Sequence, residues 1–120
     1  MNGVVDGAGR ALIVVEIGGS NLTPRTPIQA WIDTGFTGEL VLPQKTIEDL
    51  GLVNSGTVGA VLADGTQIAL RVYSCIVNWF GEQRKLEVVA TSGDHPLLGV
   101  GLLLDRDLRI DYRSRTITIQ

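Results

Sequence analysis

The chain has 120 residues, of which 44% are hydrophobic, and this is enough apolar material for one domain with a buried core. Only 19% of the residues are charged, the formal net charge is −3, and no block of like charge occurs, which excludes a basic nucleic-acid surface and a basic membrane anchor. No apolar run approaches the roughly 20 residues that a helix needs to cross a bilayer. We therefore expect neither nucleic acid nor a membrane among its partners.

The first ten residues are polar and rich in glycine. They predict a flexible leader over residues 1–10, without the apolar core of a signal peptide, followed by one domain over residues 11–120. Cys75 is the only cysteine, so no internal disulfide is possible, and this favours a cytoplasmic location. Its apolar, strand-like surroundings predict a small buried side chain rather than a reactive thiol.

Fifteen glycines, short β-rich runs and few segments with helical periodicity predict an all-β fold. The first expected strands cover Ala11–Ile17, Ile28–Ile32 and Leu40–Leu42. Residues 43–52 predict a short helix, because Pro43 suits a helix start and Gly51 suits the left-handed residue just past a helix end. Leu52 would then fold back on Ile47.

Residues 58–63 and 66–77 are two strand-like runs separated by Asp64-Gly65. This dipeptide is a strong hairpin signal, because a type I′ turn needs a positive φ at both central residues. Along the return strand the apolar residues Ile68, Leu70, Val72 and Ile76 alternate with others, which predicts that their face is buried.

The remaining segments predict further short strands and turns. Residues 79–82 predict a turn, Leu86–Ala90 a strand and Thr91–Pro96 a polar loop that leads into Leu97-Leu98-Gly99. The tail predicts a final hairpin, with strands at Leu108–Asp111 and Thr116–Ile119 on either side of a turn at residues 112–115.

The segment from Ala30 to Gly38 has the most unusual pattern in the chain. An apolar run leads directly into Asp33-Thr34-Gly35, and a second apolar run follows at residues 40–42. The tripeptide alone is more typical of a surface turn. Here it lies between two apolar runs, which predicts a carboxylate inside the protein or in a cleft, costly unless it is hydrogen-bonded or has a chemical role. Thr34 can hold it by hydrogen bonds, and Gly35 allows a sharp turn or the close approach of a ligand.

At Ile32-Asp33-Thr34-Gly35 and the following Phe36-Thr37-Gly38 the chain resembles the retropepsin-like aspartic proteases, and most closely their prokaryotic members. The resemblance extends from about residue 11 onward. It implies a closed β-barrel with one or two short helices and a flap hairpin that closes over substrate. Leu97-Leu98-Gly99 matches the second signature of the family, and residues 101–105 would form the short helix that follows it.

The resemblance also implies roles for individual residues. Asp33 would be catalytic, Thr34 would hydrogen-bond across a two-fold axis, and Gly35 would offer its backbone to the substrate. The substrate would be a peptide or protein, held by side chains of the cleft and of the flap tip. These candidates are Phe36, Val61, Leu62, Ala63, Asp64, Gly65 and Leu98.

Peptide hydrolysis by carboxylates needs two of them. Two carboxyl groups about 3 Å apart share one proton, so that one activates water while the other protonates the scissile carbonyl. The chain has only one Asp-Thr-Gly and about half the length of a two-lobed enzyme, so the resemblance implies a homodimer in which Asp33 of each chain meets on the two-fold axis.

The chain departs from the retroviral pattern in a paired way. Retroviral enzymes usually carry an aspartate at the position of Thr37 and an arginine at that of Val100, and the two form an ion pair near the dimer interface. Both charges are absent here together, which leaves no buried charge unpaired. The departure concerns the detailed dimer contacts and leaves the dyad itself unaffected.

Other functions fit the sequence less well than this one. His95 is the only histidine and lies in a polar loop, so neither a Ser-His-Asp site nor a metal site is expected, and no cofactor is implied. A non-catalytic dimerisation or peptide-binding module with the same fold is the main alternative. A β-barrel binding domain unrelated to proteases is the other. An intact Asp33-Thr34-Gly35 argues against the module, because a decayed site has little reason to keep a costly carboxylate.

Overall fold

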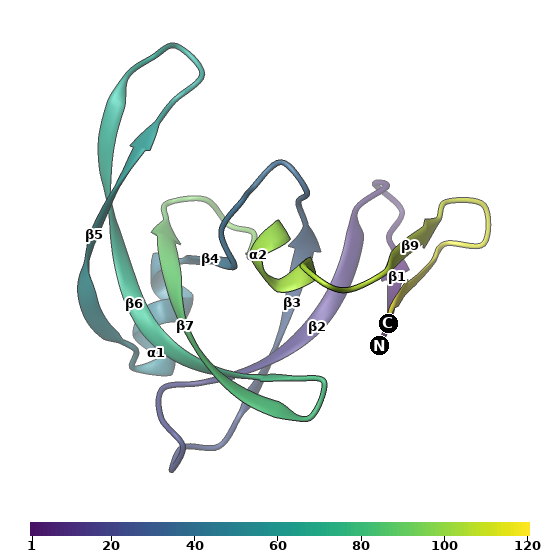
Figure 1. The fold of residues 1–120 in the computed structure, drawn as a ribbon, viewed down its shortest axis with the longest axis horizontal. Coiled ribbons are helices and arrows are strands. Elements are labelled where there is room, and N and C mark those ends of the chain that lie inside the picture. The colour runs from purple at the N-terminus through teal and green to yellow at the C-terminus, as the bar shows by residue number, and fades with distance from the viewer.

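The computed structural model describes residues 1–120 and consists of ten strands and two short helices (Figure 1). In chain order the elements are β1 (Asn2–Val5), β2 (Ala11–Gly18), β3 (Thr26–Ile32), β4 (Leu40–Pro43), α1 (Gln44–Leu50), β5 (Val53–Val61), β6 (Gln67–Trp79), β7 (Glu82–Thr91), β8 (Leu97–Leu98), α2 (Val100–Leu103), β9 (Leu108–Asp111) and β10 (Thr116–Ile119). The predicted all-β class is confirmed. Neither helix is long and apolar enough to span a membrane.

All ten strands belong to one strongly bent sheet. Neighbouring strands follow the order β5-β6-β7-β4-β8-β3-β2-β1-β10-β9, and β2 also pairs with β6. This extra pairing joins residues 16–18 to residues 76–78 and closes six of the strands into a ring. The closure is short and four strands lie outside the ring, so the predicted barrel is present but is not a regular one.

Core side chains come from the strands of this ring and also from β1 and β10 beside it. Along β2 the side chains of Ala11, Ile13, Val15 and Ile17 are buried, whereas Val14 and Glu16 between them are exposed. This alternation is the period-two pattern of a strand with one face on the core. No charged side chain is buried, and the core is built of aliphatic residues, two aromatic side chains and one cysteine.

Residues 1–10 differ from the sequence expectation. Instead of being a flexible leader, Asn2–Val5 forms strand β1, which lies between β2 and β10. Val5 is buried in the core, and the terminal amino group of Met1 donates a hydrogen bond to the carbonyl oxygen of Ile119 (2.9 Å). The two chain ends consequently lie side by side (Figure 1). Four residues without strong apolar alternation gave no signal of this pairing, which depends on the distant β10.

The hairpin β5–β6 is present, but its turn differs from the prediction. The amide of Leu62 donates to the carbonyl of Thr66 (2.8 Å) and that of Gly65 to the carbonyl of Leu62 (2.9 Å), and only Gly65 has a positive φ, at 85°. This is a five-residue connection with glycine at the left-handed position, not a type I′ turn. The two-residue turn with positive φ at both positions occurs instead at Phe80-Gly81, between β6 and β7.

Helix α1 ends as the sequence predicts. Gly51 has left-handed backbone angles (φ 65°, ψ 34°), and the amide of Leu52 donates to the carbonyl of Ile47 (3.2 Å). Both Ile47 and Leu52 are buried, which completes the expected contact across the helix end. Helix α2 begins one residue earlier than expected and spans four residues.

The single thiol is buried in the core, as predicted, with 1% of Cys75 exposed. Burial, and secondarily the charge of Glu39, raises the pKa of Cys75 from 9.0 to about 12. We expect native protein at pH 8 to react with a thiol reagent such as Ellman's reagent only as fast as it unfolds, whereas protein in urea reacts at once. Because the unfolded thiol loses its proton near pH 9 and the folded one only near pH 12, folding stability falls across that window. The Cys75→Ala variant is the control for non-specific colour, and rapid labelling of the native protein would contradict the prediction.

Candidate functional site

Asp33 follows directly after the last residue of β3 and is half-buried. Its backbone amide donates to the carbonyl oxygen of Leu98 (2.9 Å), and its Oδ1 accepts a hydrogen bond from the amide of Gly35 (2.9 Å). The carboxylate is therefore fixed at one oxygen by its own loop, while the other oxygen has no partner within the chain.

Strand β8 determines where this loop lies. Leu97 and Leu98 are inserted between β3, with which they pair in parallel, and β4, with which they pair antiparallel. Directly after β8, the amides of Gly99, Val100 and Gly101 donate to the carbonyls of Glu39, Phe36 and Gly38 at 2.9, 2.8 and 2.9 Å. The segment that follows Leu98 is thus joined to the Asp33 loop by consecutive backbone hydrogen bonds. These bonds hold the loop rigidly.

Thr34 does not hold Asp33 within one chain, contrary to the expectation from its residue type. It is exposed, and its hydroxyl group makes no hydrogen bond in the structure. The amide of Gly35 supplies the contact to the carboxylate instead. The predicted bond of Thr34 across a two-fold axis involves a second chain and stays a prediction.

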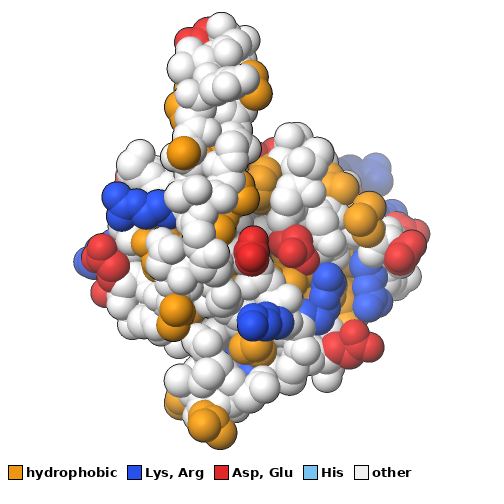
Figure 2. All heavy atoms as spheres, turned by 60° about the vertical axis from the view of Figure 1, so that its left-hand side comes forward, with side chains coloured by type: hydrophobic (Ala, Val, Ile, Leu, Met, Phe, Trp, Pro, Cys, Tyr) orange, Lys and Arg blue, Asp and Glu red, His pale blue; other side chains and the backbone are white.

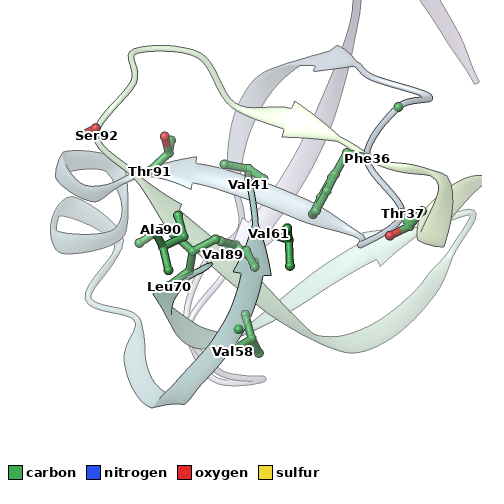
Figure 3. Close-up of a pocket in the computed structure, with 14 residues that line it drawn as sticks. Phe36, Thr37, Val41, Val58, Val61, Leu70, Val89, Ala90, Thr91 and Ser92 are labelled. Carbon is green, nitrogen blue, oxygen red and sulfur yellow. The ribbon is translucent and has the colours of Figure 1, made fainter. Parts of the chain in front are cut away.

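A groove of about 690 Å³ lies beside the Asp33 loop, between this loop, the β5–β6 hairpin and the end of β7. In Figure 2 the hairpin stands out from the body of the molecule, and hydrophobic side chains gather at its base. Figure 3 shows Phe36 and Thr37 at one end of the groove and Thr91 and Ser92 at the other. The lining consists of Gly35, Phe36, Thr37, Val41, Val58, Gly59, Ala60, Val61, Ile68, Leu70, Val89, Ala90, Thr91 and Ser92.

The predicted cleft residues fall into three groups. Phe36 and Val61 line the groove. Residues 62–65 form the exposed tip of the hairpin and do not line it, so their contact with substrate stays a prediction. Leu98 is fully buried beneath the loop, and its predicted place in the cleft lining is corrected: the β8 strand pairs on both sides and turns this side chain into the core.

Most of the groove lining was not identified from the sequence. The alternation along β6 predicts a buried face for Ile68 and Leu70, but both are half-buried and lie on the wall of the groove. Val41, Val89 and Ala90 come from strands whose apolar pattern indicates only burial, and Thr91 and Ser92 begin a segment that the sequence predicts only as a polar loop. Alternating apolar residues do not distinguish a core face from a groove wall, so no local signal marked them.

Asp33 itself borders a second, smaller hollow of about 340 Å³, which is also lined by Trp31, Ile32 and Leu97. His95 contacts the edge of the Trp31 ring, at 6.0 Å between ring centres, and lies 3.1 Å from Nη1 of Arg10. Asp33 is the only carboxylate in the lining of either hollow. One chain therefore brings one acid to this site.

Glu39 ends the Asp33 loop and forms an ion pair with Arg84. Its Oε2 lies 3.3 Å from Nη2 of Arg84. Burial raises the pKa of Glu39 above its ordinary value, and the guanidinium group of Arg84 opposes this shift. The structure gathers no group of three or more His, Cys, Asp or Glu side chains that would hold a metal ion.

The fold is similar to those of several solved proteases. A retropepsin-like aspartic protease from Rickettsia conorii is 19% identical, with a TM-score of 0.66 over 99% of this chain and 88% of that chain. The EIAV protease, solved with the inhibitor HBY-793, is 20% identical, with a TM-score of 0.58 over 80% of this chain and 86% of that chain. The simian foamy virus (mac) protease is 24% identical, with a TM-score of 0.54 over 77% and 90%. The sequence matches no family model and no curated protein.

These likenesses extend over most or all of the chain. They show that it has a retropepsin-like fold, in agreement with the motifs at Asp33-Thr34-Gly35 and Leu97-Leu98-Gly99.

Proposed function

We propose that this chain is an aspartic endopeptidase that acts as a homodimer, with Asp33 of each chain forming the catalytic pair. The observation that carries the proposal is the position of Asp33. Its carboxylate is half-exposed beside an apolar groove, on a loop that backbone hydrogen bonds from residues 99–101 hold in place, within a retropepsin-like fold.

The need for a second chain follows from the chemistry. No other carboxylate lines the hollows around Asp33, and a single carboxylate cannot both activate water and protonate the scissile carbonyl. A second copy of the chain, related by a two-fold axis, supplies its own Asp33 as the other carboxylate of the pair. The free hydroxyl of Thr34 and the unpartnered oxygen of Asp33 are the groups that such a copy would meet.

In the proposed reaction, one Asp33 takes a proton from water, which attacks the carbonyl carbon of the scissile peptide bond. The other Asp33 gives its proton to the carbonyl oxygen and stabilises the tetrahedral intermediate. Collapse of the intermediate breaks the C–N bond: the first Asp33 gives the proton that it took from water to the leaving amine, and the second Asp33 takes its proton back from the hydroxyl group that becomes the new carboxyl group. The β5–β6 hairpin acts as a flap over the groove, where it excludes water from the bound peptide.

The activity per chain should therefore depend on chain concentration in the same way as the fraction of chains that form dimers. We expect the cleavage rate per chain, measured on a diverse peptide library between pH 4 and 7, to rise with the dimer fraction measured by sedimentation over the same dilution series. Constant activity per chain across the monomer–dimer transition would contradict a shared site. Folded dimers that bind peptides without cutting them would support the alternative, a non-catalytic peptide-binding module.

A further inference from the structure

The groove beside Asp33 does not end at Thr91 and Ser92. A further hollow of about 300 Å³ continues from it, and the two have Leu70, Ala90, Thr91 and Ser92 in common. The continuation adds Gln44, Ala69 and Arg71 to the lining. One depression therefore runs from the Asp33 loop, past an aliphatic middle, to a polar end near the start of α1.

Arg71 is the one charged side chain that lines either hollow. It is exposed and forms no ion pair within the chain, and its cross-strand neighbour in β5 is Thr57, which carries no charge. At the same end Ser92 offers a free hydroxyl group, and the amide of Gln44 already donates to the hydroxyl of Tyr73 (3.2 Å). Arg71 lies near the hydroxyl group of Tyr73 but has no acidic partner within the chain. Such a guanidinium group suits a carboxylate, which it can bind through two parallel hydrogen bonds.

The shape of the groove favours an extended peptide over other anions with an apolar part. Four consecutive residues of β5, Val58 to Val61, line the groove. Because successive side chains of a strand point to opposite faces, such a run implies that the backbone edge of β5 borders the groove. β5 is the last strand of the sheet, so its outer amides and carbonyls are free to pair with an extended chain.

We propose that this depression selects peptides with aliphatic residues next to the Asp33 end and an acidic side chain at the distal end, where Arg71 binds it. The proposal rests on the proposed function in one respect, namely that the ligand is a peptide. It adds Arg71 as a specificity-determining residue that takes no part in the chemistry.

Binding to the uncleaving Asp33→Asn variant separates this proposal from catalysis. The probes are fluorescent aliphatic peptides with blocked ends, made in matched pairs that differ only in having Glu or Gln at one position. One pair carries this residue near the N-terminus of the peptide and the other pair carries it near the C-terminus. We expect the preferred Glu peptide to bind about 5- to 10-fold more tightly than its Gln partner at low salt, and less so at high salt. Adding Arg71→Gln should abolish this preference while the Gln peptide binds as before.

Arg113→Gln is the matched control, because it removes the same charge from an exposed turn far along the chain, where Arg113 has no ion pair. Equal affinity for Glu and Gln peptides, an equal loss in both arginine variants, or no peptide binding would overturn the proposal. Tighter binding of laurate than of any peptide would assign the groove to amphiphiles and overturn it as well. A different outcome is that the protein with Asp33 intact cleaves no peptide, while the Glu peptide still binds selectively. That result would overturn the proposed protease activity and leave this inference standing.

Discussion

Replacing Asp33 with asparagine is expected to abolish peptide cleavage while leaving the fold intact. The variant keeps the size of the side chain and an oxygen that can accept the hydrogen bond from the Gly35 amide (2.9 Å). It removes the only group in the hollow that can take a proton from water. We expect kcat/KM to fall by at least about 10³-fold, measured on the best peptide found in the library.

The matched control is Asp49→Asn, which removes an exposed carboxylate from α1 with no side-chain hydrogen bond. It should cleave at the wild-type rate, and both variants should melt within about 2 °C of the wild type. If Asp33→Asn retains activity, the cleavage comes from another site or from a contaminant, and the central assignment fails.

Mixing the two proteins tests whether the site is shared between chains. If chains exchange and pair at random, adding an equal amount of Asp33→Asn to a fixed amount of wild type leaves about half of the original active dimers. Total activity should therefore fall to about one half, since mixed dimers hold a single Asp33. Independent chains would show no such fall, because each wild-type chain would work alone.

The sequence predicted the strands around Asp33 well because their signals are local. The apolar run before Asp33, the glycine after α1 and the alternation in β2 each depend on residues that lie next to one another in the chain. The final strands β9 and β10 have the predicted bounds for the same reason. Period-two patterns and cap residues carry enough information for this scale.

The remaining features depend on contacts between distant segments. Asn2–Val5 becomes a strand because β10, more than a hundred residues later, offers it an edge. The connection at Asp64-Gly65 is local, but the same dipeptide also suits a longer turn with a positive φ at glycine alone, and here the amide of Leu62 pairs with Thr66 (2.8 Å). The groove wall at Ile68 and Leu70 exists only because β5–β6 extends away from the core. Such placements follow from tertiary packing, which local pattern does not contain.

Gly99, the glycine of the second signature, is needed for packing. Its backbone is extended (φ −98°, ψ 178°), so any residue could adopt these angles. A Cβ atom there, however, would lie 2.5 Å from Cδ2 of Phe36 and 2.7 Å from its carbonyl oxygen, and would overlap the carbonyl oxygen of Gly38. Two of these atoms belong to the backbone of the Asp33 loop, so they cannot move without breaking the hydrogen bonds that hold it.

We therefore expect Gly99→Ala to lower the free energy of unfolding by about 2–4 kcal/mol, and the melting temperature by about 10–20 °C. Urea unfolding and calorimetry measure both quantities. Gly7→Ala is the control, because a Cβ atom at Gly7 meets nothing within 4 Å, and it should melt like the wild type. A Gly99→Ala protein with wild-type stability would mean that the Asp33 loop yields easily. The loop would then not be rigid, and its backbone hydrogen bonds would not be what positions the carboxylate for a second chain.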